Sequence, residues 1–200
     1  MPSFINSKLS NFQEARRIDY TTFWAEIAPC EHVLDIYSNE SEFLDSLVNF
    51  VSIGLKQGDS VILIATEMHL QHVEHELMRM GLDLDTLAAE RKYFSRDARS
   101  VLSKFMVADW PDEKKFQETI LSLLNEAKHD GKKIRAFGEM VALLWAEGLS
   151  AATVRLEHLW AELCKRTEIS LFCAYPMSGV TEDPTNSIQH IIDAHSRLVC

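Results

Sequence analysis

Seven residues whose side chains could bind a ligand stand at the ends of predicted strands or of the predicted closing helix. They are Tyr37, Ser38, Thr66, Glu67, Glu139, Tyr175 and His195. The set offers aromatic faces, hydroxyls, carboxylates and one imidazole, and amides at helix starts add hydrogen-bond donors. Such a surface suits a small ligand that is mostly apolar or weakly polar, or a signalling partner. We predict that these residues form the binding site.

Four of the seven, Tyr37, Thr66, Glu139 and Tyr175, end predicted strands. Because ligands of parallel sheets bind at the carboxyl ends of the strands, we expect these four to surround one crevice. Glu139 has two interpretations, either a ligand anchor or an anion that stabilises the start of the next helix. The two tyrosines could line the pocket or pack in the core. For His195, a surface position and a position facing Glu139 both stay open.

The turn after the first predicted strand lacks the features of a phosphate-binding loop. Such a loop needs glycines, which let backbone amides approach the phosphates, and a lysine that neutralises them. Residues 37–43 read Tyr-Ser-Asn-Glu-Ser-Glu-Phe, with two acids and neither glycine nor lysine, and the chain has no GxGxxG. We therefore expect no tight ATP binding, no hydrolysis of ATP and no nucleotide cofactor.

Histidines cluster on one predicted helix, where His69, His72 and Glu76 have the spacing of helical neighbours. Such a set could hold a metal. These residues flank the apolar stripe of the helix, so the pattern favours a solvated face and no metal. His32, at the opposite end of its strand from the predicted site, is expected to be structural.

The cysteines give no sign of a zinc knuckle or a redox pair. They are Cys30, Cys164, Cys173 and Cys200, far apart and without a CxxC. Cys164 and Cys173 fall in apolar segments, where a buried reduced thiol is expected. We predict no cofactor.

The elements that would position the site alternate along the chain. Strand patterns occupy residues 32–37, 60–66, 92–95, 133–137 and 169–175. Helical patterns occupy residues 40–57, 67–80, 100–107, 109–130, 141–147, 151–166 and a closing segment from residue 183. Strands separated by helix-length segments require crossover connections. The pattern predicts an α/β fold in three layers, with a mainly parallel sheet and helices on both faces. We expect residues 31–200 to form one domain and residues 1–30 a helical N-terminal extension.

Composition narrows the class of partner. The chain has 200 residues, 46% of them hydrophobic, and a net charge of −10. An acidic protein repels nucleic acid and anionic lipid, so neither is expected as a partner. Neither a secretory signal nor a long apolar run is evident, and we expect a cytoplasmic protein. A homodimer is compatible with the sequence.

Several short motifs follow one another along the chain: His32-Val-Leu-Asp-Ile-Tyr37, Gly54-Leu-Lys-Gln-Gly58, Ser60-Val-Ile-Leu-Ile-Ala65, Met80-Gly-Leu-Asp83, Gly138-Glu-Met140, Arg155-Leu-Glu157, Ser170-Leu-Phe-Cys-Ala-Tyr175 and Ala194-His195. In this order they resemble the MEDS domain, the DcmR-like sensory module of methanogens and methylotrophs. The resemblance covers residues 31–199. It implies a fold similar to RecA-like and KaiC-like ATPases with a degenerate phosphate loop.

The resemblance also implies a non-catalytic sensory role in signal transduction, since such domains occur beside histidine kinase modules and in a repressor that responds to chlorinated hydrocarbons. The chain carries neither a kinase domain nor a helix-turn-helix, so we expect the signal to pass through another protein, such as a histidine kinase or a regulator. Two alternatives stay open. One is a degenerate RecA-like hydrolase or transferase that uses Glu139 and His195, although no GxSxG is present. The other is a pure protein-interaction module.

Overall fold

The computed structural model describes residues 19–128, 131–179 and 187–199, and its centre is a six-stranded parallel sheet. The strands run in the order β3-β2-β6-β7-β1-β8. Their bounds are β1 (His32–Tyr37), β2 (Ser60–Ala65), β3 (Tyr93–Asp97), β6 (Ile134–Gly138), β7 (Ser170–Pro176) and β8 (Arg197–Leu198). All five predicted strands are confirmed. The sixth, β8, was not predicted, because a strand of two residues is too short to show a hydrophobic period.

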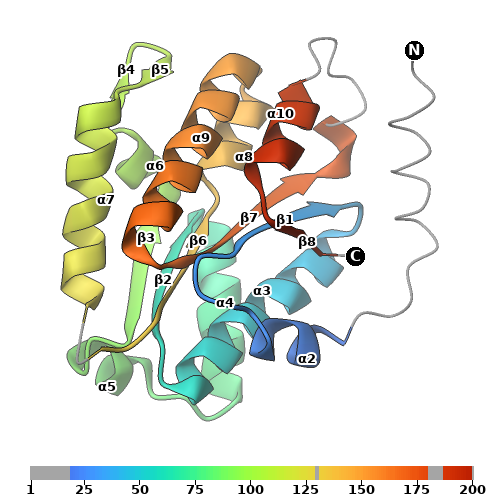
Figure 1. The fold of residues 1–200 in the computed structure, drawn as a ribbon. Helices are drawn as coiled ribbons and strands as arrows, with labels where there is room; N and C mark the ends of the chain where they lie inside the picture. The colour runs from blue at the N-terminus through green and yellow to red at the C-terminus, as the bar shows by residue number, and fades with distance from the viewer. Residues whose placement is uncertain (1–18, 129–130, 180–186, 200) are drawn as a thin grey trace.

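Helices cover both faces of the sheet, as predicted (Figure 1). One face is covered by α2 (Tyr20–Ala25), α3 (Glu40–Gln57), α4 (Glu67–Arg79) and α5 (Leu84–Ala89). The other is covered by α6 (Ala98–Leu102), α7 (Glu113–Ala127), α8 (Met140–Ala146), α9 (Ser150–Thr167) and α10 (Ser187–Ala194). The buried apolar residues form two separate clusters, one on each side of the sheet. The fold is therefore the three-layer α/β architecture expected from the sequence.

Local sequence explains where α3 begins and ends. The Asn39 side chain accepts a hydrogen bond from the Ser41 amide at 2.9 Å, which caps the first turn. Gly58 ends the helix in the left-handed conformation, with φ of 82°, where a side chain would be strained. Together these two residues fix the length of the first crossover, which delivers the chain to β2.

The segment between β3 and α7 differs from the prediction. A helix was expected over residues 100–107, but α6 ends at Leu102 and a small antiparallel hairpin follows, β4 (Met106–Val107) and β5 (Trp110–Pro111). The helix expected from residue 109 begins only at Glu113, because Asp112 caps it by accepting from the Lys115 amide at 2.9 Å. Turn residues, rather than the spacing of apolar residues, determine the secondary structure of this segment.

The first described helix, α2, belongs to the core of the domain. The Trp24 side chain is fully buried, and its Nε1 donates to Ser46 Oγ on α3 at 3.1 Å. Arg135 on β6 donates to the Trp24 carbonyl at 2.7 Å. Residues 1–18, over which the predicted N-terminal helix begins, lie outside the described residues, as does the predicted start of the closing helix at residue 183. Within the described ranges, no helix is long and apolar enough to cross a membrane.

Candidate functional site

The carboxyl ends of β2 and β6 are neighbours whose chains leave toward opposite faces of the sheet. After β2 the chain enters α4 on one face, and after β6 it enters α8 on the other. Adjacent strands that diverge in this way form a topological switch point, the usual place for a ligand in an open α/β sheet. Thr66 and Glu139 stand at this position, one after each strand.

Glu139 joins the two strand ends. Its Oε2 accepts a hydrogen bond from the Thr66 amide at 2.7 Å, and the Thr66 hydroxyl lies 3.2 Å from the same oxygen. The side chain is nearly buried, at 10% exposure. Glu139 occupies the N-cap position of α8, but its side chain does not cap that helix. Its carboxylate instead lies on the opposite face, beside α4, so the interpretation of Glu139 as a cap of its own helix is wrong.

His69, on the first turns of α4, completes this group. Its Nδ1 lies 3.0 Å from Glu139 Oε2, and its Nε2 lies 3.3 Å from Glu40 Oε1. Nδ1 is buried and forms an ion pair with the Glu139 carboxylate, although the two groups are not aligned as in a regular hydrogen bond. Burial lowers the pKa of His69, but Glu139 and Glu40 outweigh that effect and raise the pKa above its ordinary value. The folded protein therefore favours a charged His69 between two carboxylates.

The expectation that His69 lies on a solvated face is wrong, because α4 turns this side chain toward Glu139 and leaves only 7% of it exposed. His72 is exposed, as expected, and so is His75 on the same helix. The place of His69 in this group was missed for this reason. The sequence did offer one indication of this position. His69 lies on the first turn of a helix that begins at the carboxyl end of a strand, and Glu40 lies at the start of another such helix.

Tyr37 extends the group with an aromatic surface. Its ring stacks on Phe43, with centroids 4.5 Å apart, and Phe43 in turn packs edge-on against His69 at 5.5 Å. Burial and the nearby charges of Glu139, Glu40 and Asp35 raise the pKa of Tyr37 to about 12. The phenol therefore stays neutral and can donate a hydrogen bond. Ser38 and Glu67 are exposed at the margin, where Glu67 accepts from Gln71 at 3.2 Å.

Tyr175 and His195 do not join this group, which corrects the expectation of one crevice lined by all four strand ends. Tyr37 pairs with Pro176, so Tyr175 is one residue out of step with Tyr37. Because successive side chains of a strand point to opposite faces, Tyr175 belongs to the core on the α8–α9 side. There it is fully buried and donates to Glu157 on α9.

His195 lies on the same side as Tyr175 and is neither on the surface nor beside Glu139. Its side chain is 0% exposed, and its Nε2 lies 3.6 Å from Glu157 Oε2. Burial lowers the pKa of His195 to about 4. With the sheet between Glu139 and His195, these residues cannot act as the catalytic pair of the hydrolase or transferase alternative.

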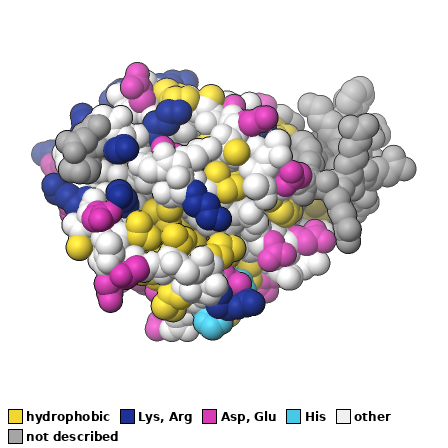
Figure 2. All heavy atoms as spheres, turned by 90° about the horizontal axis from the view of Figure 1, so that it is seen from below, with side chains coloured by type: hydrophobic (Ala, Val, Ile, Leu, Met, Phe, Trp, Pro, Cys, Tyr) yellow, Lys and Arg dark blue, Asp and Glu magenta, His cyan; other side chains and the backbone are white. Residues whose placement is uncertain are grey.

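Two open hollows of about 630 Å³ lie away from the switch point. One lies between α4, α5 and β3, with Met78, Leu84 and Phe94 in its lining. The other lies at the amino ends of β6 and β7, where Lys132, Lys165 and neighbouring cations surround apolar side chains. Figure 2 shows hydrophobic side chains gathered on the lower face of the molecule, with Lys and Arg around them. Among the described residues that line them, these hollows hold no buried ion pair comparable with His69 and Glu139.

Comparison with known proteins identifies a family and solved structures with a similar fold. The profile of a family described as "MEDS: MEthanogen/methylotroph, DcmR Sensory domain" matches residues 31–196. A solved structure of a protein from Pyrococcus horikoshii OT3 is similar, with a TM-score of 0.56 at 13% sequence identity, over 90% of this chain and 86% of that chain. No curated protein matches the sequence significantly. The structural likeness supports the fold alone, whereas the family match spans the sheet from β1 to β7 and both covering layers.

Proposed function

Because the chain belongs to the MEDS family of sensory domains, we propose that it senses by binding a small ligand at the carboxyl ends of β2 and β6. The observation that carries this proposal is the nearly buried pair of His69 and Glu139 at the topological switch point, with Nδ1 of the imidazole 3.0 Å from Oε2 of the carboxylate. Removing two charged groups from water is costly even when they are paired. A ligand that hydrogen-bonds to either side chain would offset part of that cost.

The chemistry of the residues around His69 defines the class of ligand. Glu139 supplies a carboxylate that can accept a hydrogen bond, His69 supplies a donor, and the stacked rings of Tyr37 and Phe43 supply an apolar surface. Glu40 and Glu139 would repel an anion. The group therefore suits a small neutral or cationic molecule with a modest polar part, and it does not suit a phosphate compound.

The proposed role is binding and signalling without catalysis. The alternative dyad of Glu139 and His195 is divided by the sheet, and the proposal assigns a reaction to neither residue. Ligand occupancy would change the contacts of Glu139, which connects the start of α4 to the end of β6. A change in these contacts can be passed to a protein partner that binds α4 or α8, such as a histidine kinase or a regulator.

A fragment screen followed by amide NMR shifts tests this proposal. Bound fragments are expected to shift the amides of Thr66, His69 and Glu139. The Glu139→Gln variant, which keeps the size of the side chain but removes its charge, should bind them about 10- to 100-fold more weakly, since a hydrogen bond to a charged group contributes ~1.5–3 kcal/mol.

Glu147→Gln is the matched control, because Glu147 is exposed at the other end of the same helix, α8. This variant should bind fragments as the unmodified protein does. Fragments that bind only elsewhere, or bind Glu139→Gln unchanged, would overturn the proposed site.

A further inference from the structure

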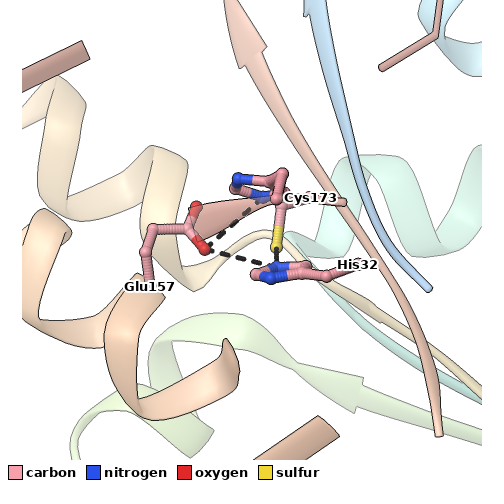
Figure 3. Close-up of side chains that lie close together, drawn as sticks. His32, Glu157 and Cys173 are labelled. Atoms are coloured by element: carbon pink, nitrogen blue, oxygen red, sulfur yellow. Dashed lines mark hydrogen bonds and ion pairs between the residues drawn. The ribbon is translucent and has the colours of Figure 1, made fainter. Parts of the chain in front are cut away.

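Four side chains with metal-binding atoms lie close together on the face of the sheet that α9 covers. His32 comes from β1, Cys173 from β7, Glu157 from α9, and His195 follows α10 (Figure 3 labels the first three). One ligand atom from each lies within 4.8 Å of the other three. His32 is 3% exposed, Cys173 and Glu157 are fully buried, and so is the His195 side chain. None of the four belongs to the group around His69, which lies on the other face of the sheet.

Both imidazoles are oriented by backbone carbonyls. His32 Nδ1 lies 3.1 Å from the Ala194 carbonyl, and His195 Nδ1 lies 2.6 Å from the Ile191 carbonyl. A carbonyl can only accept, so each Nδ1 carries the hydrogen and each neutral ring has its lone pair on Nε2. Metal-bound histidines are commonly held in this way, with the second ring nitrogen donating to a carbonyl or carboxylate.

The two Nε2 atoms point at the same carboxylate oxygen. Glu157 Oε2 lies 3.4 Å from His32 Nε2 and 3.6 Å from His195 Nε2. Neither Glu157 Oε2 nor His195 Nε2 has a hydrogen-bond partner, although both are buried. The other carboxylate oxygen, Oε1, is occupied, because it accepts from the Tyr175 hydroxyl. Nitrogen atoms of two imidazoles and one carboxylate oxygen therefore face one another around a single point.

The spacing suits a tetrahedral metal ion. Bond lengths of about 2.0–2.3 Å to nitrogen, oxygen and sulfur imply ligand–ligand separations of roughly 3.3–3.8 Å. The separation of His32 Nε2 from Cys173 Sγ is 3.4 Å, and the two distances to Glu157 Oε2 also fall in this range. Small side-chain rotations suffice to bring the remaining pairs, which are within 4.8 Å, to bonding positions.

We propose that His32, Glu157, Cys173 and His195 bind a divalent first-row transition metal, with Zn²⁺ the best match to two imidazoles, one thiolate and one carboxylate. All four positions of the tetrahedron are filled by the protein, which is the arrangement of a structural zinc site. On binding, the Cys173 S–H bond breaks, its proton leaves to solvent and the S–metal bond forms. The metal would tie the segment after α10 to β1, β7 and α9, independently of any ligand at the switch point.

Cobalt binding to the full chain tests the proposal. The protein is unfolded in urea with chelator and refolded anaerobically with Co²⁺, because the buried site is closed to a metal added afterwards. One equivalent of Co²⁺ should bind, with the visible bands of tetrahedral Co²⁺ and a thiolate-to-cobalt charge-transfer band, and Zn²⁺ should displace it. Elemental analysis of the protein as purified should also find close to one metal per chain.

Variants assign the ligands. Cys173→Ser should lose the charge-transfer band, and Glu157→Gln should bind the metal at least 10-fold more weakly. Cys164→Ser is the matched control, because Cys164 is also buried but lies outside the group, and this variant should keep the band. The wild-type titration does not depend on whether a variant folds. Failure of the refolded wild-type chain to bind Co²⁺ or Zn²⁺ stoichiometrically would overturn the proposal, as would equal loss of the band in both cysteine variants.

Discussion

The His69 imidazole lies 3.0 Å from the Glu139 carboxylate, across the gap between α4 and the end of β6. Two carboxylates face this ring, Glu139 from the β6–α8 turn and Glu40 from the start of α3. Phe43 packs edge-on against the ring and separates it from Tyr37, which stacks on Phe43. Burial lowers the pKa of His69, and the two carboxylates raise it by more. This relationship makes the stability of the fold depend on pH at the candidate site.

The first prediction follows from that raised pKa. A histidine whose pKa is higher when folded stabilises the protein fully below its unfolded value, 6.5, and the contribution is lost as pH rises through the folded value. The difference in unfolding free energy between wild type and His69→Gln should therefore be larger at pH 6 than at pH 9, measured by urea denaturation. His72→Gln, an exposed change on the same helix, should show no such difference. A pH-independent effect of His69→Gln would contradict the prediction.

The second prediction concerns Asp35, a buried carboxyl on β1. Burial, with a contribution from Glu42, raises its pKa to about 7 from an ordinary value of 3.8. The unfolded chain then ionises first, so stability falls as pH rises from about 4 to about 7 and stays low above that. Asp35→Asn should raise the unfolding free energy at pH 8 by roughly 2–4 kcal/mol, since one pKa unit corresponds to about 1.4 kcal/mol.

At pH 4 the same Asp35→Asn change should have little effect, because the carboxyl of the wild-type protein is then largely protonated in the folded state. Urea denaturation at the two pH values provides the comparison. An equal gain at both would show that the amide acts by its shape rather than by removing a buried charge.

The third prediction concerns the buried ion pair of Arg135 and Asp59. Arg135 Nε donates to Asp59 Oδ2 at 2.6 Å, and its other nitrogens donate to the Trp24 carbonyl and the Gln57 side chain. Arg135→Met leaves Asp59 buried without its partner, which typically costs 3–5 kcal/mol. Chemical denaturation should show a loss of about that size, and Asp59→Asn added to Arg135→Met should recover part of it.

Arg155→Met is the control for Arg135→Met, because Arg155 makes a comparable bond to Glu113 at 2.7 Å but on the surface. An exposed pair contributes only about 0–1 kcal/mol. Similar losses in the two variants would show that burial of the pair is not what makes Arg135 important.

The fourth prediction is the absence of nucleotide binding. The turn from β1 into α3 presents Glu40 and Glu42 at the helix start, where a phosphate-binding loop would present glycine amides and a lysine. Isothermal titration with Mg-ATP should therefore show no binding at micromolar concentrations. Micromolar affinity, with amide shifts at residues 37–43, would mean that backbone geometry overcomes the repulsion of both acids.

Much of the fold could be predicted because it depends on local patterns. The apolar run of β2 is buried along its whole length, which indicates a strand covered on both sides. Asn39 and Gly58 mark the ends of α3 through capping chemistry that involves only nearby residues. The order of strands and helices then requires parallel crossovers, and the family resemblance, confirmed over residues 31–196, agrees with it.

Local sequence patterns did not determine which of the predicted site residues lie together in the structure. The sequence by itself correctly placed four residues at strand ends: Tyr37, Thr66, Glu139 and Tyr175. It did not determine to which face of the sheet each side chain points. Register decided the faces: Tyr175 pairs with Ile36 rather than with Tyr37, and a shift of one residue turns a side chain to the other side of the sheet.

The group of His32, Glu157, Cys173 and His195 was equally hidden, because its members are far apart in the chain and lack the close spacing of a zinc motif. What the sequence determined was the set of elements, through hydrophobic period and capping. Only the tertiary structure decided which ionisable side chains share a buried space, because strand order and register bring distant residues together.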